Sequence, residues 1–187
     1  MTARELATLI GMDTEDLVNV DVAPSSGDGE VGEREQRFFA QLGERDGPGV
    51  AGAVARLLDR WRGIGGAISY GRSETTSCSP VIEPGSRTAI WPVTFYPGST
   101  VEVVFLQLKT RPPFDDPALR SELRRRLNQA PDIELPLAKL ELRPSFPIAW
   151  LADPETWQVV ADTLSWFAAT VFEYREAQHS EPDESAA

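Results

Sequence analysis

Three side chains in the middle of the chain have types and a spacing that suit metal-dependent phosphodiester cleavage. Gln107 and Lys109 end the apolar run VVFLQLK, and Glu83 ends an earlier apolar run, SPVIE. Residues two apart on a strand point to the same face, so Gln107 and Lys109 would point together. In such a site carboxylates bind Mg²⁺, and a lysine orients or activates the attacking water. One hypothesis is therefore a nuclease centred on these three residues.

This arrangement is similar to the PD-(D/E)xK nucleases but departs from their pattern in two respects. Gln107 is neutral where those enzymes place an acid, which weakens a Mg²⁺ site, and Glu83 is not in a Pro-Asp context. A lysine at the end of a strand is more often a solvated terminus than a catalytic group. A divergent metal-dependent nuclease is therefore kept as the alternative function, and the preferred interpretation assigns no catalytic residue.

Other catalytic chemistries find few suitable residues in this chain. The single histidine, His179, lies in the polar C-terminal tail, so Ser-His-Asp and Cys-His catalysis lack a base. Cys78 is the only cysteine, which excludes an intramolecular disulfide and a cysteine-rich zinc site. The chain contains no Walker A loop, no GxGxxG motif and no EF-hand loop. We predict no metal and no cofactor, and favour a non-enzymatic protein.

Arginines and tryptophans in and near loops form a candidate binding surface. Arg120 and Arg124 are four apart on a predicted helix, and the turns RPPF (111–114) and RPSF (143–146) each add an arginine. Aromatic residues at loops often serve recognition, and arginine suits phosphates and acidic partners. The alternative of a solvated arginine face, paired with acids on the same helix, stays open. The candidate binding residues are Trp91, Arg111, Arg120, Arg124, Arg143 and Trp150.

Charge and composition limit the partners. The formal net charge is −11, which argues against a general nucleic-acid binder and leaves nucleic acid possible only through a local basic patch. No apolar stretch has the length needed to span a bilayer, and the N-terminus lacks the apolar region of a signal peptide. We predict a cytoplasmic protein with a protein partner; the sequence does not indicate an oligomeric state.

The chain is predicted to hold one domain, residues 34–175, between two polar ends. Residues 1–33 form a flexible N-terminal segment, because 23–33 is a linker of Ser, Gly and acidic residues. Within it, 3–20 shows a weak amphipathic helix pattern carried by Leu6, Leu9, Ile10 and Leu17. This helix either docks in a partner groove or packs loosely on its own domain. The tail 176–187 has the composition of a disordered segment.

The periodicity of the domain predicts an α+β fold with N-terminal helices, a four-stranded, mainly antiparallel sheet and two C-terminal helices. The segment ERDGPG separates two N-terminal helices, and the last two strands form a hairpin at Pro97-Gly98. The strands are predicted at 67–71, 79–83, 88–98 and 100–109, and the later helices at 116–129 and from Asp153 onward. Asp115 or Asp116 and Asp153 are the expected caps, each followed by a proline suited to the first turn.

Several segments together resemble a domain of uncharacterised bacterial proteins. They are ARLLDRW, AISYG, TFYPGSTVEVVFLQLKTRPPFDD, LRRRLN, RPSFPIAWLADPE and LSWF, and they cover roughly residues 55–172. The resemblance implies a single compact domain and no known activity. The repeated RPPF and RPSF turns are interpreted as two loops that are each anchored by a buried phenylalanine.

Overall fold

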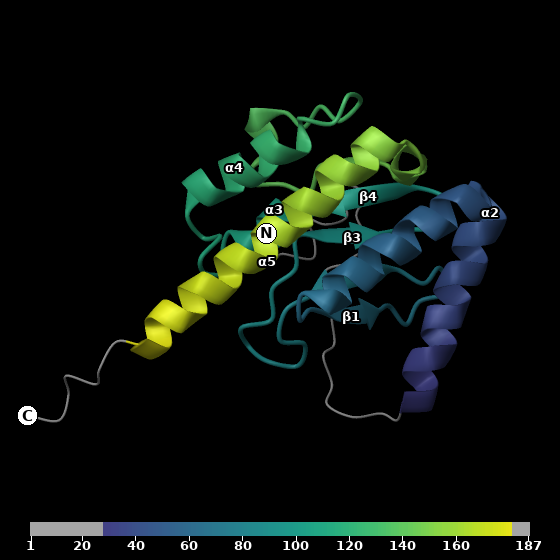
Figure 1. The fold of residues 1–187 in the computed structure, drawn as a ribbon, viewed down its shortest axis with the longest axis horizontal. Helices are drawn as coiled ribbons and strands as arrows, with labels where there is room; N and C mark the ends of the chain where they lie inside the picture. Colours follow the sequence, from purple (N-terminus) through teal and green to yellow (C-terminus); the bar gives the residue numbers. More distant parts are fainter. Residues whose placement is uncertain (1–27, 181–187) are drawn as a thin grey trace, which may run out of the picture.

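The computed structural model describes residues 28–180, which form helices around a five-stranded antiparallel sheet (Figure 1). The α+β class is confirmed. The expected amphipathic helix at 3–20 and the end of the C-terminal tail lie outside the described residues. Within 28–180, no helix combines the length and the apolar character that crossing a membrane would require.

Helix α2 (Asp28–Gly63) is two helical segments joined at a sharp kink. Gly47 lies at the kink with φ 86°, a conformation that costs glycine little, and Pro48 begins the second segment, where a missing N–H is harmless. The break predicted at ERDGPG is therefore confirmed. The predicted linker at 23–33 is wrong from Asp28 onward, because these residues already belong to the helix.

The sheet has the strand order β1-β2-β3-β4-β5, with every neighbouring pair antiparallel. Its strands are β1 (Ala67–Tyr70), β2 (Cys78–Val81), β3 (Val93–Phe95), β4 (Thr100–Val103) and β5 (Ser145–Pro147). Phe95, Val101 and Phe146 lie in one row of paired positions and are almost completely buried. Figure 1 shows α5 and the second segment of α2 crossing one face of this sheet.

Two differences from the expected strands change the region around the candidate residues. The fifth strand was missed because Ser145–Pro147 has only three residues, one of them a proline, and pairs at the edge of the sheet with β4. The strand expected at 100–109 ends at Val103, and helix α3 (Phe105–Leu108) follows it. Phe105 and Leu108 are buried three residues apart, a spacing that places both on the inner side of a helical turn.

The remaining helical elements are α4 (Pro117–Leu127), the 3-10 turns η1 (Leu137–Lys139) and η2 (Ile148–Ala152), and α5 (Pro154–Ser180). Asp116 caps α4 by accepting from the Ala118 N–H at 2.7 Å, and Asp153 caps α5 by accepting from the Thr156 N–H at 2.8 Å. Both predicted caps are confirmed. Helix α5 runs further than expected, so residues 176–180, including His179, are helical.

The core lies between the helices and the sheet, and its largest fully buried side chains include Trp61, Phe38, Phe95 and Phe105. Phe114 of the RPPF turn is 0% exposed and stacks on Phe167 of α5 with ring centroids 4.2 Å apart. Phe146 of the RPSF turn is 2% exposed. Each turn is thus anchored by a buried phenylalanine, as the sequence predicts.

Candidate functional site

The three residues of the nuclease hypothesis are engaged in separate structural contacts. Lys109 follows α3 and forms an ion pair with Glu141. Glu83 pairs with Arg175 of α5 at 2.9 Å and accepts from the Thr88 hydroxyl at 2.7 Å. Gln107 and Lys109 do not share a strand face, since β4 ends at Val103, so the geometric premise of the hypothesis is wrong. No group of three His, Cys, Asp or Glu side chains suited to a metal ion is found within residues 28–180.

Arg120, at the centre of the predicted arginine surface, is buried. Only 3% of the residue is exposed, and its Nη1 donates to the carbonyl oxygens of Phe114 and Asp115, both at 2.7 Å. Its Nη2 approaches Glu141 at 3.4 Å. The guanidinium therefore provides hydrogen bonds to buried backbone carbonyls at the RPPF turn and just before α4, and it is not available to a partner.

Arg124, one turn later on α4, holds the segment that follows the helix. Its Nη1 donates to the Leu135 carbonyl at 2.9 Å. Asn128 makes two further bonds to Leu135, donating to its carbonyl at 3.1 Å and accepting from its N–H at 2.9 Å. Together these side chains fold the chain after α4 back along the helix.

The remaining candidate binding residues also make internal contacts. Arg111 donates to the Ala89 carbonyl and lies 5.0 Å from the centroid of Trp91, which is 5% exposed. Arg143 pairs with Glu102 at 2.5 Å, and Trp150 stacks on Phe146 with centroids 6.4 Å apart. Burial lowers the pKa of Arg111 because no carboxylate compensates the loss of hydration.

The prediction that these six residues share one exposed binding surface is therefore wrong. Trp91 and Arg120 are buried, and the arginines direct their terminal nitrogens at loop carbonyls or at a carboxylate of β4. Loops without regular structure leave carbonyls unpaired, and a long cationic side chain reaches them from a neighbouring helix. The prolines of the RPPF and RPSF turns were the sequence signal that these arginines bind loop carbonyls.

A charged cluster joins the start of α2 to β1. Glu35 accepts from Arg62 Nη2 at 2.5 Å and from the Tyr70 hydroxyl at 2.8 Å. Burial acts to raise the pKa of Glu35, but these two hydrogen bonds and the charge of Arg62 outweigh it, so the pKa lies below its ordinary value. Burial raises the pKa of Tyr70 strongly, and Cys78 and Glu35 add to that rise. Cys78 is 0% exposed, and burial raises the pKa of its thiol, so it is a poor nucleophile.

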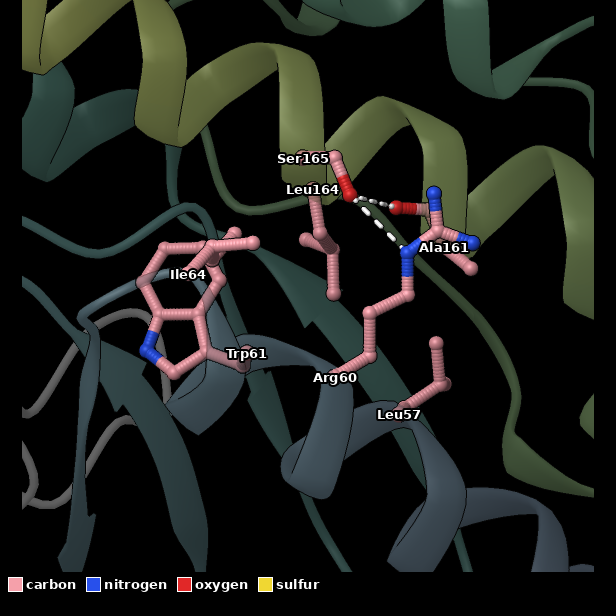
Figure 2. Close-up of a pocket in the computed structure, with 7 residues that line it drawn as sticks. All are labelled: Leu57, Arg60, Trp61, Ile64, Ala161, Leu164 and Ser165. Atoms are coloured by element: carbon pink, nitrogen blue, oxygen red, sulfur yellow. Dashed lines mark hydrogen bonds between the residues drawn. The ribbon is translucent and has the colours of Figure 1, made fainter.

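Figure 2 shows a shallow pocket between α2 and α5, lined by Leu57, Arg60, Trp61, Ile64, Ala161, Leu164 and Ser165. Arg60 crosses it and donates from Nε to the Ser165 hydroxyl at 3.1 Å and from Nη2 to Asp162 at 2.7 Å. The volume of the pocket, including its open mouth, is about 160 Å³, whereas ligand pockets in proteins typically enclose about 300–1,000 Å³. The pocket is too small for a ligand of ordinary size.

Exposed leucines mark a different part of the molecule. Leu106 of α3, Leu137 of η1 and Leu142 are 41%, 59% and 51% exposed. The Leu106 N–H donates to the Leu142 carbonyl at 3.0 Å, so these two residues lie side by side. We name Leu106, Leu137 and Leu142 the leucine surface. Sequence reasoning missed it because Leu106 fitted the buried pattern of a strand that the chain does not continue.

Comparison of the chain with protein-family models, with curated proteins and with solved structures finds no match. The resemblance to a domain of uncharacterised bacterial proteins therefore stays a prediction.

Proposed function

We propose that the protein is a non-enzymatic binding module that engages a protein partner through the leucine surface. The observation that supports this most directly is that Leu106, Leu137 and Leu142 are exposed, while backbone hydrogen bonds tie Leu142 both to Leu106 and to the turn that begins at Leu137. Leucine is usually buried, and exposed apolar side chains that lie together mark interaction sites more often than isolated ones do. The backbone hydrogen bond from Leu106 to Leu142 brings these two exposed residues to adjacent positions in the chain fold.

The composition of the border supports a protein partner over nucleic acid. The chain contains two lysines, and both lie close to the leucine surface in sequence: Lys109 is three residues after Leu106, and Lys139 is two residues after Leu137. Lys109 is paired with Glu141, so this border carries both signs of charge. A mixed polar rim around an apolar centre is the usual anatomy of a protein–protein interface.

The setting of this module belongs to the same proposal. We place the module in a bacterial protein complex as an accessory component, because its catalytic inventory is poor and the resemblance is to bacterial proteins, and the sequence suggests the cytoplasm. The nuclease alternative is not carried further, since no observation favours it: Glu83 and Lys109 each have another partner, and Gln107 lies in α3.

Quantitative affinity purification of the tagged full-length chain tests the proposal. The double variant Leu106→Ser/Leu142→Ser is compared with wild type and with Tyr174→Ser, which alters an exposed apolar residue on α5. We expect a co-purifying protein to fall at least tenfold with the leucine variant and to stay unchanged with Tyr174→Ser. A partner that both variants retain equally, or the recovery of no partner by wild type, contradicts the proposal.

A further inference from the structure

Helix α2 changes direction at a single residue. Gly47 is the residue of α2 whose backbone angles are not helical, with φ 86° and ψ 166°. Glycine adopts this combination readily, whereas a residue with a Cβ is strongly disfavoured there. Figure 1 shows the two segments of α2 leaving the kink in different directions. We name residues 28–46, the segment before the kink, the α2 arm; its direction depends on the conformation of one glycine.

The α2 arm is part of the hydrophobic core. Phe38 and Leu42, one helical turn apart, are both 0% exposed. The ring centroids of Phe38 and of Tyr70 in β1 are 5.8 Å apart. Glu35, about one turn earlier on the arm, accepts hydrogen bonds from Arg62 near the end of α2 and from the Tyr70 hydroxyl. The surface that the arm covers therefore needs such a cover in any folded state.

The α2 arm also binds two loops at the ends of the strands. Gln41 donates to the Glu74 carbonyl at 2.7 Å and accepts from the Thr76 N–H at 2.9 Å, both in the loop between β1 and β2. Asp46 accepts from the Gly98 N–H at 2.6 Å, in the turn between β3 and β4. These bonds join the arm to residues that follow the kink. The arm of a second copy would therefore make the same bonds.

A straight α2 would carry the arm away from the surface that it covers. With helical angles at Gly47, α2 would be one continuous helix of 36 residues. Short hinges favour the exchange of such an element between two copies, because the second copy restores the contacts that opening breaks. Pro48 opposes the straight form, since in a helix interior it has no N–H to donate and its ring clashes with the preceding turn.

We propose that Gly47 and Pro48 form a hinge that keeps the α2 arm on its own chain, and that without this pair two copies exchange their arms. Gly47 permits the bend, and Pro48 disfavours the straight helix. The closed hinge gives a monomer, and the open hinge gives a domain-swapped dimer in which each surface is covered by the arm of the other copy. The leucine surface lies on other elements, so this exchange is independent of the proposed function.

Size-exclusion chromatography with light scattering, run on the purified full-length chain, tests the hinge. The variant Gly47→Ala/Pro48→Ala favours the open form, because alanine disfavours the bend and does not interrupt a helix. Gly43→Ala/Gly49→Ala is the matched control, since it changes one glycine on each side of the hinge where an added Cβ meets nothing within 4 Å. We expect wild type and control to be monomers and the hinge variant to raise the dimeric fraction at least tenfold over wild type.

Photo-cross-linking identifies which arm covers which surface. p-Benzoylphenylalanine replaces Arg45, whose Nη1 lies 3.5 Å from the Thr75 hydroxyl and 3.4 Å from the Pro97 carbonyl. A matched protein carries it in place of Arg56, which follows the hinge and lies 5.5 Å from the ring centroid of Trp157. Labelled and unlabelled chains of the hinge variant are unfolded and refolded together. We expect position 45 to cross-link its two loops between chains and position 56 to cross-link α5 within one chain.

The other outcomes overturn the proposal. A hinge variant that folds as a monomer, or a dimer whose cross-links from position 45 stay within one chain, contradicts the exchange of arms. An equal dimeric fraction in the control or in wild type shows that Gly47 and Pro48 do not set the state. Circular dichroism checks folding, and a hinge variant that stays unfolded at high concentration also contradicts the proposal, because exchanged arms would restore the contacts of the closed form.

Discussion

Replacing Arg120 by methionine should destabilise the fold strongly. The change removes both hydrogen bonds from Nη1 and leaves the Phe114 and Asp115 carbonyls without that donor. A hydrogen bond from a charged donor contributes about 1.5–3 kcal/mol, and methionine recovers part of the loss through apolar burial, so we expect a cost of about 3 kcal/mol. For a chain of this length, that corresponds to a fall in Tm of about 6–12 °C.

Arg125→Met on the same helix is the matched control. Arg125 is exposed and, among residues 28–180, pairs with Glu122 alone, so the same substitution should leave the unfolding midpoint within error of wild type. Urea denaturation followed by tryptophan fluorescence and circular dichroism measures both variants, with m-values compared to confirm two-state behaviour. Equal midpoints for the two variants would refute the assignment of Arg120 as an internal anchor.

Three further predictions concern packing, reactivity and pH. A Cβ added at Gly66 would lie 2.1 Å from Trp61 Nε1, whereas one at Gly63 meets nothing within 4 Å. Gly66→Ala should therefore lower the free energy of unfolding by about 1–3 kcal/mol and Gly63→Ala should not lower it, which a comparison of their urea midpoints checks. Cys78 is fully buried, and its raised pKa keeps it a thiol, so Ellman's reagent should label it only on unfolding; fast labelling of native protein would contradict this burial. The pKa of Glu35 is lowered in the folded protein, so this group contributes stability above its ordinary pKa of 4.5, and that stability is lost as pH falls through the folded-state pKa. Tyr70→Phe should reduce that loss; urea curves at several pH values that do not differ between the two proteins would show that the bond to Glu35 contributes nothing.

The elements with local signals were predictable from the sequence. The kink at Gly47, the caps at Asp116 and Asp153, and the antiparallel sheet all follow from turn residues, capping residues and periodicity. The end of β4 did not follow, since the apolar run VVFLQL is compatible with either a strand or a helix until its tertiary neighbours decide.

The candidate site was less predictable than the fold. Arg120 and Arg124 have the spacing of an exposed face, and nothing in that spacing shows that loop carbonyls lie within reach. Which arginine is internal depends on where the chain after α4 returns, and that is a property of long-range packing. The exposure of Leu106 depends on the same region, because it follows from the early end of β4.

The central claim is that the leucine surface binds the partner and that the internal arginines stabilise the fold. One paired measurement tests it most directly. Partner occupancy and urea midpoint are recorded for Leu106→Ser/Leu142→Ser and for Arg124→Gln, which loses the hydrogen bond from Arg124 to the Leu135 carbonyl. The account predicts that the folded fraction of the leucine variant loses the partner, whereas the arginine variant has a lower midpoint than wild type and its folded fraction keeps the partner. Partner loss with fully folded Arg124→Gln, and none with the leucine variant, would contradict it.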